Sequence, residues 1–224
     1  MAEIYNSNPL LKAAGVQQEF TPEQIQEYMK CARDPIYFIE NYCQIVTLDH
    51  GLQPFKLYDC QKKKIDIIHN NRRVILMEGR QQGKTTTSAA YILWYTLFQE
   101  AKQVAILANK KTAAMEVLDR YQIMYEHLPM WMQAGVTTWN KGDIELENGS
   151  KVFTAATGKS GIRGKSVNML YVDEAAIIPN NVAEEFFTSV YPTISAGETT
   201  KILLSSTPLG YNHFWKFWND AEQG

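Results

Sequence analysis

The sequence predicts an α/β fold in which helices cover both faces of a mainly parallel sheet, after a small helical N-terminal segment. Beyond residue 51, short apolar runs alternate with longer amphipathic ones, which is the pattern of strand-and-helix units. The short runs are apolar throughout, as expected for parallel strands buried on both faces. A chain of 224 residues, 45% of them hydrophobic, is long enough to form one such domain with appendages.

Charge and composition exclude several classes of protein. With 22 Lys and Arg against 24 Asp and Glu, the net charge is -2, so no overall field attracts the chain to nucleic acid. No apolar run reaches the ~18 residues of a membrane span, and we expect neither an inserted nor a secreted protein. The three cysteines, Cys31, Cys43 and Cys60, lack metal-ligand spacing, which favours reduced thiols and a reducing cytosol.

The N-terminal segment predicts an arm and two helices. Residues 1–20 show no clear periodicity, so we expect an irregular arm there. The Thr-Pro-Glu-Gln run at residues 21–24 has a capping box with proline at the first helical position, and it predicts a helix to about Arg33. Asp34-Pro35 breaks that helix, and residues 36–46 are expected to form a second short one.

The remaining elements follow in order along the chain. Asn148-Gly149 between two apolar runs is a strong hairpin signal. The other apolar runs are expected to be parallel strands joined by helices. The expected strands are residues 74–77, 103–108, 144–146, 151–153, 169–172 and 202–205, and the expected helices are residues 58–69, 84–99, 112–127 and 182–190.

The turn after the first of these strands has the residues of a phosphate-binding loop. Its sequence, Gly-Arg-Gln-Gln-Gly-Lys-Thr-Thr, begins at Gly79 and leads into a helix. Glycine permits a positive φ, so that successive N–H groups point at one phosphate, and the helix N-terminus adds partial positive charge. Lys84 is then expected to contact the β and γ phosphates, and the Thr85 hydroxyl to coordinate Mg²⁺.

The match to the usual pattern of such loops is imperfect. A glycine normally stands at the position of Glu78, and in this chain the glycine comes one residue later, at Gly79. The alternative interpretation is an ordinary strand-to-helix turn with an exposed lysine. We favour nucleotide binding, and the predicted binding residues are Gly79, Arg80, Gln81, Gln82, Gly83, Lys84, Thr85 and Thr86.

Two adjacent carboxylates, Asp173 and Glu174, directly follow the strand at residues 169–172. Open α/β sheets bind their ligands at the C-terminal ends of parallel strands. Asp173 is expected to hold Mg²⁺ and Glu174 to orient and deprotonate an attacking water, which favours hydrolysis over kinase chemistry. Without the phosphate loop, a solvated strand end explains the same pair equally well.

A hydroxyl-rich run, Ser205-Ser206-Thr207, follows the last apolar strand and leads into Pro208 and Gly210. Ser, Thr, Pro and Gly are also the usual residues of turns. Taken by itself, this run is explained by an ordinary turn.

Together, these motifs resemble one protein family. The chain looks like the ATPase domain of the large terminase subunit, the DNA-packaging motor of tailed bacteriophages, in GRQQGKTT, MLYVDEAAIIP and LLSSTPLGYNHFWKFW, with SGIRGKS before the acidic strand. These proteins share a deviant phosphate loop with an Arg-Gln-x-Gly-Lys-Thr core, which accounts for the displaced glycine. The resemblance runs from about Gln53 to the C-terminus. It implies a P-loop NTPase domain of RecA-like type at residues 51–224, after an arm and helical lead-in at residues 1–50.

The resemblance also implies roles for individual residues. Ser206 and Thr207 match the coupling motif, which links the state of the γ-phosphate to movement. Gln61 matches the glutamine that recognises adenine, because an amide can pair with the adenine edge through two hydrogen bonds. On the residues alone, Gln61 is more simply a surface residue of a helix. The roles given above for the phosphate loop and the acidic pair carry over to Lys84, Thr85, Asp173 and Glu174.

Two arginines are candidates for stabilising charge on the transferred phosphate. Arg80 lies inside the loop and would act in cis, whereas Arg163, between glycines, would reach a neighbouring subunit. An arginine finger accelerates such reactions by about 10³–10⁵-fold. The simpler role for either arginine is a pair with a carboxylate. We favour Arg163 as the finger in trans.

The function implied is Mg²⁺-dependent ATP hydrolysis that drives double-stranded DNA into a viral procapsid. The family further implies a ring of identical subunits on the portal protein, a small terminase partner, and the host cytoplasm as the location. The family's nuclease domain has no room in this chain, and nuclease activity is not assigned to it. Two alternatives stay open: an ATPase lobe of a helicase, and a nucleotide-dependent assembly module without useful turnover.

Three basic clusters are candidates for contacts with DNA phosphates, although such runs are more often solvated faces. The clusters are Lys62–Lys64, Arg72-Arg73 and Lys110-Lys111. Because short clusters and a net charge of -2 neutralise few phosphates, we expect the chain by itself to bind double-stranded DNA weakly.

Overall fold

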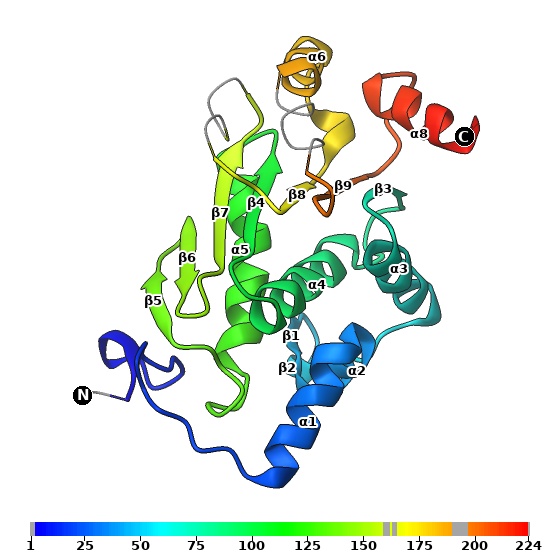
Figure 1. Cartoon of the computed structure of the whole chain (residues 1–224). Coiled ribbons are helices and arrows are strands. Elements are labelled where there is room, and N and C mark those ends of the chain that lie inside the picture. Colours follow the sequence, from blue (N-terminus) through cyan, green and yellow to red (C-terminus); the bar gives the residue numbers. More distant parts are fainter. Residues whose placement is uncertain (1–2, 159–161, 163–164, 190–196, 224) are drawn as a thin grey trace.

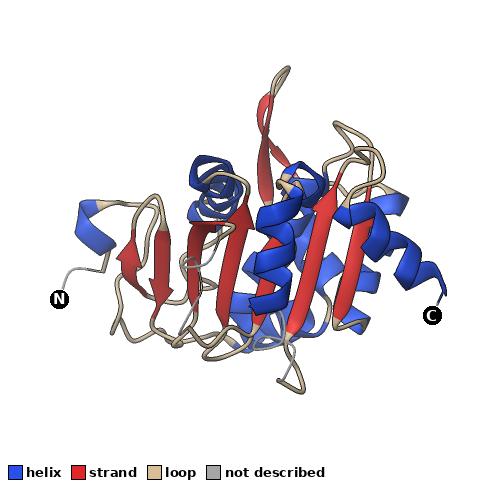
Figure 2. Ribbon diagram, turned by 90° about the horizontal axis from the view of Figure 1, so that it is seen from above, coloured by secondary structure: helices blue, strands red, loops and turns tan. Residues whose placement is uncertain are grey.

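A computed structural model describes residues 3–158, 162, 165–189 and 197–223. Within these residues the centre of the molecule is a seven-stranded sheet in the order β3-β9-β8-β4-β7-β6-β5 (Figure 2). The first five strands in this order are parallel, and the last two pair antiparallel. The strands are β3 (Arg73–Met77), β9 (Lys201–Ser206), β8 (Met169–Val172), β4 (Gln103–Ala108), β7 (Lys151–Ala156), β6 (Asp143–Leu146) and β5 (Val136–Trp139).

Helices cover both faces of the sheet, and each face has its own core. Along β4, Val104 and Ile106 belong to one buried cluster, while Ala105 and Leu107 belong to the other, because successive side chains on a strand point to opposite faces. The first cluster includes side chains of α3 (Asp59–Asn70), α4 (Lys84–Phe98) and α5 (Lys111–Glu126), and the second those of α6 (Asn180–Ser189) and α8 (His213–Gln223). The predicted α/β architecture is therefore confirmed.

The N-terminal segment packs outside this sandwich, and Figure 1 shows it beyond α4. After a short 3-10 turn, η1 (Tyr5–Ser7), it forms α1 (Pro22–Arg33) and α2 (Pro35–Tyr42). The expected capping box is present: the Thr21 hydroxyl accepts a hydrogen bond from the Gln24 N–H, and the Gln24 side chain accepts one from the Thr21 N–H. Phe38 and Ile39 of α2 join the core that also contains α4.

One predicted element differs from the structure. The helix expected over residues 36–46 ends at Tyr42, and Gln44–Thr47 form a strand, β1, that pairs antiparallel with β2 (Gly51–Pro54). The β-branched residues of β1 suit a strand, and Gly51 turns the chain with a φ of 65°. This hairpin projects from the body of the molecule (Figure 2). The sequence pattern missed it because the pairing depends on β2, whose residues are all exposed.

The strand order brings three chain segments together at one sheet edge. β9 lies between β3 and β8, with Met77 opposite Ser206 and Val172 opposite Leu204. These strands are parallel, so their C-terminal ends meet, and with them the turns that follow.

Two further findings concern the expectations from composition. In the part of the chain that the structure describes, no helix is long and apolar enough to cross a membrane. All three cysteines are unpaired, with Cys31 and Cys43 buried and Cys60 exposed.

Candidate active site

The loop between β3 and α4 has the backbone of an anion-binding turn. Gln81 and Gly83 lie in the left-handed region, with φ of 61° and 74°. For glutamine this conformation costs roughly 1–2 kcal/mol, a strain that tends to occur at functional sites. Because α4 begins at Lys84 after a glycine, no capping side chain covers its first turn, whose N–H groups point toward the loop.

Lys84 and Glu174 form an ion pair across this loop. The Lys84 Nζ lies 2.7 Å from Glu174 Oε1, and only 7% of Lys84 is exposed. The predicted phosphate-binding lysine and the predicted catalytic carboxylate are therefore in direct contact. A bound phosphate and Glu174 would compete for the same ammonium group.

Glu174 also contacts the hydroxyl-rich run. Its second oxygen, Oε2, accepts hydrogen bonds from the hydroxyls of Ser206 at 3.3 Å and Thr207 at 3.4 Å. Burial raises the pKa of Glu174, but the hydrogen bond and charge of Lys84 outweigh burial, and that pKa is lowered overall. The backbone of Glu174 is left-handed, with φ 49° and ψ 45°. The structure thus brings the predicted catalytic and coupling residues together.

Asp173 lies beside Thr85 at the end of β8 and is 7% exposed. Its Oδ1 accepts a hydrogen bond from the Tyr171 hydroxyl at 2.8 Å, and its Oδ2 accepts one from the Thr85 hydroxyl at 3.3 Å. Burial raises the pKa of Asp173, the Tyr171 hydrogen bond opposes this, and the negative charge of Glu174 adds to the rise. The two residues predicted to hold Mg²⁺ are therefore adjacent.

The residues present fit a magnesium ion. No group of three or more His, Cys, Asp or Glu side chains in the described ranges is arranged to hold a metal. Mg²⁺ does not need such a group, because it takes one or two carboxylates and completes its shell with water and substrate phosphates. The oxygens of Thr85 and Asp173, 3.3 Å apart, are close to the ~3 Å spacing of neighbouring ligands around Mg²⁺.

Gln61 packs against the loop and not at the surface. It is 4% exposed; its Nε2 donates to the Gln82 carbonyl at 3.2 Å, and its Oε1 accepts from the Tyr58 N–H at 3.1 Å. Its Nε2 also stands 2.6 Å from the place where a Cβ on Gly83 would lie, so a larger residue there requires Gln61 to move. The interpretation of Gln61 as a surface residue is therefore wrong, and recognition of adenine stays a prediction.

The structure places the other predicted residues less closely. Arg80 is exposed in the loop, and Arg163 lies outside the described residues. Thr86 lines a separate cavity of about 410 Å³ with Gln44 and Ile45. The choice between the two arginines stays a prediction.

Two contributors escaped the sequence argument. Tyr171, which holds Asp173, lies two residues before it, and strand alternation places both side chains on one face. Lys64 forms a buried ion pair with Glu78 at the start of the loop, with 2.9 Å between Nζ and Oε2. Lys64 follows Gln61 at helical spacing on α3, so the spacing indicates a shared face.

The basic clusters are less available to DNA than their sequence indicates. Lys64 is 4% exposed, and Lys62 pairs with Glu40 at 3.0 Å. Arg72 donates to the carbonyls of Gly197 and Thr200. The lysine run is therefore largely used inside the molecule.

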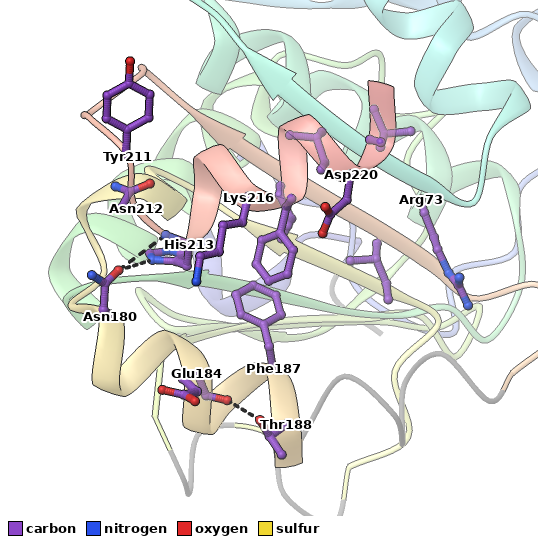
Figure 3. Close-up of a pocket in the computed structure, with 16 residues that line it drawn as sticks. Arg73, Asn180, Glu184, Phe187, Thr188, Tyr211, Asn212, His213, Lys216 and Asp220 are labelled. Carbon is purple, nitrogen blue, oxygen red and sulfur yellow. Dashed lines mark hydrogen bonds between the residues drawn. The ribbon is translucent and has the colours of Figure 1, made fainter. Parts of the chain in front are cut away.

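A cavity of about 820 Å³ lies between α6, α8 and the edge of the sheet (Figure 3). Phe187 and Phe217 face each other across it, and Asn180 contacts His213 at one end. None of the predicted nucleotide-binding residues lines this cavity, and its walls are mostly apolar.

Comparison with known structures shows the same fold in large terminases. The HK97 bacteriophage large terminase matches with a TM-score of 0.72 and 20% identity, over 86% of this chain and 41% of that one. A large terminase from a thermophilic bacteriophage gives 0.60 and 16%, over 76% and 44%. The ATPase domain of the Thermus phage P74-26 large terminase gives 0.55 and 22%, over 73% and 69%. The chain therefore spans about two fifths of the length of the HK97 protein.

Sequence comparison extends the likeness to the motifs themselves. The family described as "Terminase large subunit, T4likevirus-type, N-terminal" matches residues 75–224. This segment includes the phosphate loop, the acidic pair and the hydroxyl-rich run, which the sheet brings to one edge. The chain thus belongs to the large terminase subunit family and corresponds to its N-terminal part.

Proposed function

We propose that this chain hydrolyses ATP as the ATPase domain of a motor that drives double-stranded viral DNA into a procapsid. The observation that carries the proposal is the position of Glu174, which contacts Lys84 through one oxygen and the hydroxyls of Ser206 and Thr207 through the other. A motor must convert a change at the γ-phosphate into movement. One carboxylate shared between the phosphate-binding lysine and the coupling residues suits that task.

Nucleotide binding is the first step. The large terminase of the thermophilic bacteriophage compared above has been solved in complex with ADP and with ATP-gamma-S. In this chain the N–H groups of the loop and of the first turn of α4 would hold the phosphates, with Gln61 at the adenine edge. Phosphate oxygens would take the Lys84 ammonium from Glu174, because they carry more negative charge.

Hydrolysis follows from the release of Glu174. Its contact with Lys84 lowers its pKa, so the loss of that contact makes the carboxylate a stronger base. Glu174 then accepts a proton from the water that attacks the γ-phosphorus in line. The new bond joins the water oxygen to phosphorus, the bond to the β-phosphate oxygen breaks, and ADP leaves with the electron pair.

The oxygens of Thr85 and Asp173 are the groups that would hold Mg²⁺, which supplies charge neutralisation at the phosphates. The Tyr171 hydroxyl keeps the Asp173 carboxylate turned toward Thr85. A cation beside Asp173 favours its ionised form, although burial raises its pKa.

The assembly supplies the remaining charge. We assign Arg163 as the finger that completes the site of a neighbouring subunit, with Arg80 in cis as the alternative. The subunits would form a ring on the portal protein, with the small terminase subunit as a further partner, in the host cytoplasm. Membership in the family supports these assignments.

A phosphate-release assay with and without duplex DNA tests the proposal. Glu174→Gln should keep ATP affinity within a few fold and lower turnover by about 10² or more, as expected for loss of a general base. Lys84→Ala should weaken nucleotide binding itself. Glu116→Gln, which alters an exposed glutamate of α5, is the matched control and should behave as the unchanged protein. Wild-type release no faster than that of Glu174→Gln would leave only a nucleotide-binding module.

A further inference from the structure

The phosphate loop of this chain begins with an unfavourable residue. Glu78 stands where such loops normally have glycine, and it places a carboxylate at the start of a loop that must bind anions. Like charges brought together in a partly buried site repel, so an uncompensated Glu78 would oppose phosphate binding. The structure shows where the compensation comes from.

Lys64 neutralises this carboxylate. Its Nζ lies 2.9 Å from Glu78 Oε2, and the two side chains are 5% and 19% exposed. Burial lowers the pKa of Lys64, and the hydrogen bond and charge of Glu78 oppose that effect. The charge of Lys84 also lowers the pKa of Lys64, so this pair lies close enough to the phosphate-binding lysine to influence it.

The same helix contacts both ends of the loop. Lys64 binds Glu78 where the loop begins, and Gln61, one turn earlier on α3, donates to the Gln82 carbonyl where it ends. The Glu78 N–H donates in turn to the Ser206 carbonyl on β9. The start of the loop is therefore fixed between α3 and the strand that leads to the coupling residues.

We propose that Lys64 and Glu78 are a positioning pair for the phosphate loop, in which Lys64 cancels the charge that Glu78 would otherwise present to a bound nucleotide. The proposal rests on the proposed function, because it assumes that the loop binds ATP. It predicts an asymmetry between the two partners. Removal of Lys64 exposes nucleotide phosphates to a carboxylate, whereas removal of the charge on Glu78 leaves an additional cation.

The test is the affinity for ADP in the presence of MgCl₂, measured by calorimetry, with thermal unfolding of every variant. Lys64→Met should weaken ADP binding by about tenfold or more. Glu78→Gln should bind ADP as tightly as the unchanged protein or more tightly. The double variant Lys64→Met/Glu78→Leu should return to within about threefold of it, because a buried ion pair can be replaced by apolar residues of similar volume. Lys63→Met removes a neighbouring exposed lysine from α3 and should have no effect.

Each result decides the matter. Equal losses of affinity in Lys64→Met and Glu78→Gln would mean that the pair only stabilises the fold, and would overturn the proposal. Wild-type affinity in a folded Lys64→Met would overturn it as well. If Lys64→Met does not fold, the double variant decides, and poor ADP binding by that folded variant contradicts the pair. Absence of ADP binding by the unchanged protein would instead reject the proposed function, and the inference with it.

Discussion

Asp173 and Glu174 are neighbours in the chain, yet their surroundings shift their pKa values in opposite directions. Burial at the end of β8 raises the pKa of Asp173, while Lys84 lowers the pKa of Glu174 despite the burial of that side chain. Paired carboxylates with divergent pKa values commonly have distinct chemical roles. Here the difference arises because the left-handed backbone at Glu174 turns its side chain toward Lys84 and away from Tyr171.

Asp173→Asn should stabilise the nucleotide-free protein at neutral pH. A carboxyl whose pKa is raised on folding binds more protons in the folded state, so stability falls as pH rises above the ordinary aspartate pKa. The amide avoids this cost and can keep the hydrogen bond from Tyr171. We expect a gain of about 0.5–2 kcal/mol at pH 7, the range common for stabilising changes at functional sites.

Thermal unfolding of both proteins from pH 7 to pH 5 measures this effect. The difference between the two proteins should shrink as the pH falls toward the ordinary pKa of an aspartate. An equal difference at all pH values, or a less stable Asp173→Asn, would show that Asp173 is not destabilising when ionised.

At the scale of elements, the site depends on how β9 joins α3 and β3. The Lys201 Nζ at the start of β9 donates to three carbonyls at the C-terminal end of α3, those of Ile68, His69 and Asn71, at 2.8, 2.8 and 2.9 Å. A cation at this end of a helix also interacts favourably with the helix dipole. Lys201 thereby connects the helix that contacts the phosphate loop to the strand that carries Ser206.

Lys201→Met should destabilise the protein by about 2 kcal/mol, because three carbonyls lose their donor at once. Lys141→Met, which removes an exposed lysine before β6, should change stability by less than about 0.5 kcal/mol. Chemical denaturation of the two variants gives both values. Equal effects would mean that the hydrogen bonds of Lys201 contribute nothing beyond its charge.

At the scale of the whole molecule, the catalytic site is proposed to be completed by a neighbour. If Arg163 acts in trans, the specific ATPase activity should rise with protein concentration, because a monomer lacks the finger. Mixing Arg163→Ala with Glu174→Gln subunits should restore part of the activity, since each supplies what its neighbour lacks. Activity that does not depend on concentration, without restoration on mixing, would transfer the role to Arg80.

The whole surface also limits contact with DNA. The net charge is -2, and two lysines of the 62–64 cluster are engaged in ion pairs. We expect weak, sequence-independent binding of a short duplex with a shallow dependence on salt, because few phosphates are neutralised. A salt titration of the monomeric chain measures this. Nanomolar affinity at physiological salt would reveal a dedicated DNA-binding surface.

Much of the fold was accessible from local pattern. The apolar runs that form β3, β4 and β8 carry their signal in a few consecutive residues, most of them buried. The Asn148-Gly149 turn joins β6 to β7 as expected, with Gly149 at a φ of 80°. The β1–β2 hairpin was not accessible in this way, because its strands are largely exposed and depend on each other.

The sequence by itself determined the α/β architecture, the loop around Lys84 and the carboxylates after β8, because each of these is written in residues adjacent in the chain. Only the tertiary structure decided what those residues touch. The placement of β9 between β3 and β8 brings Ser206 to Glu174, and the packing of α3 brings Lys64 to Glu78. Such contacts join residues far apart in sequence, so their partners are set by strand order and helix packing, which no local pattern records.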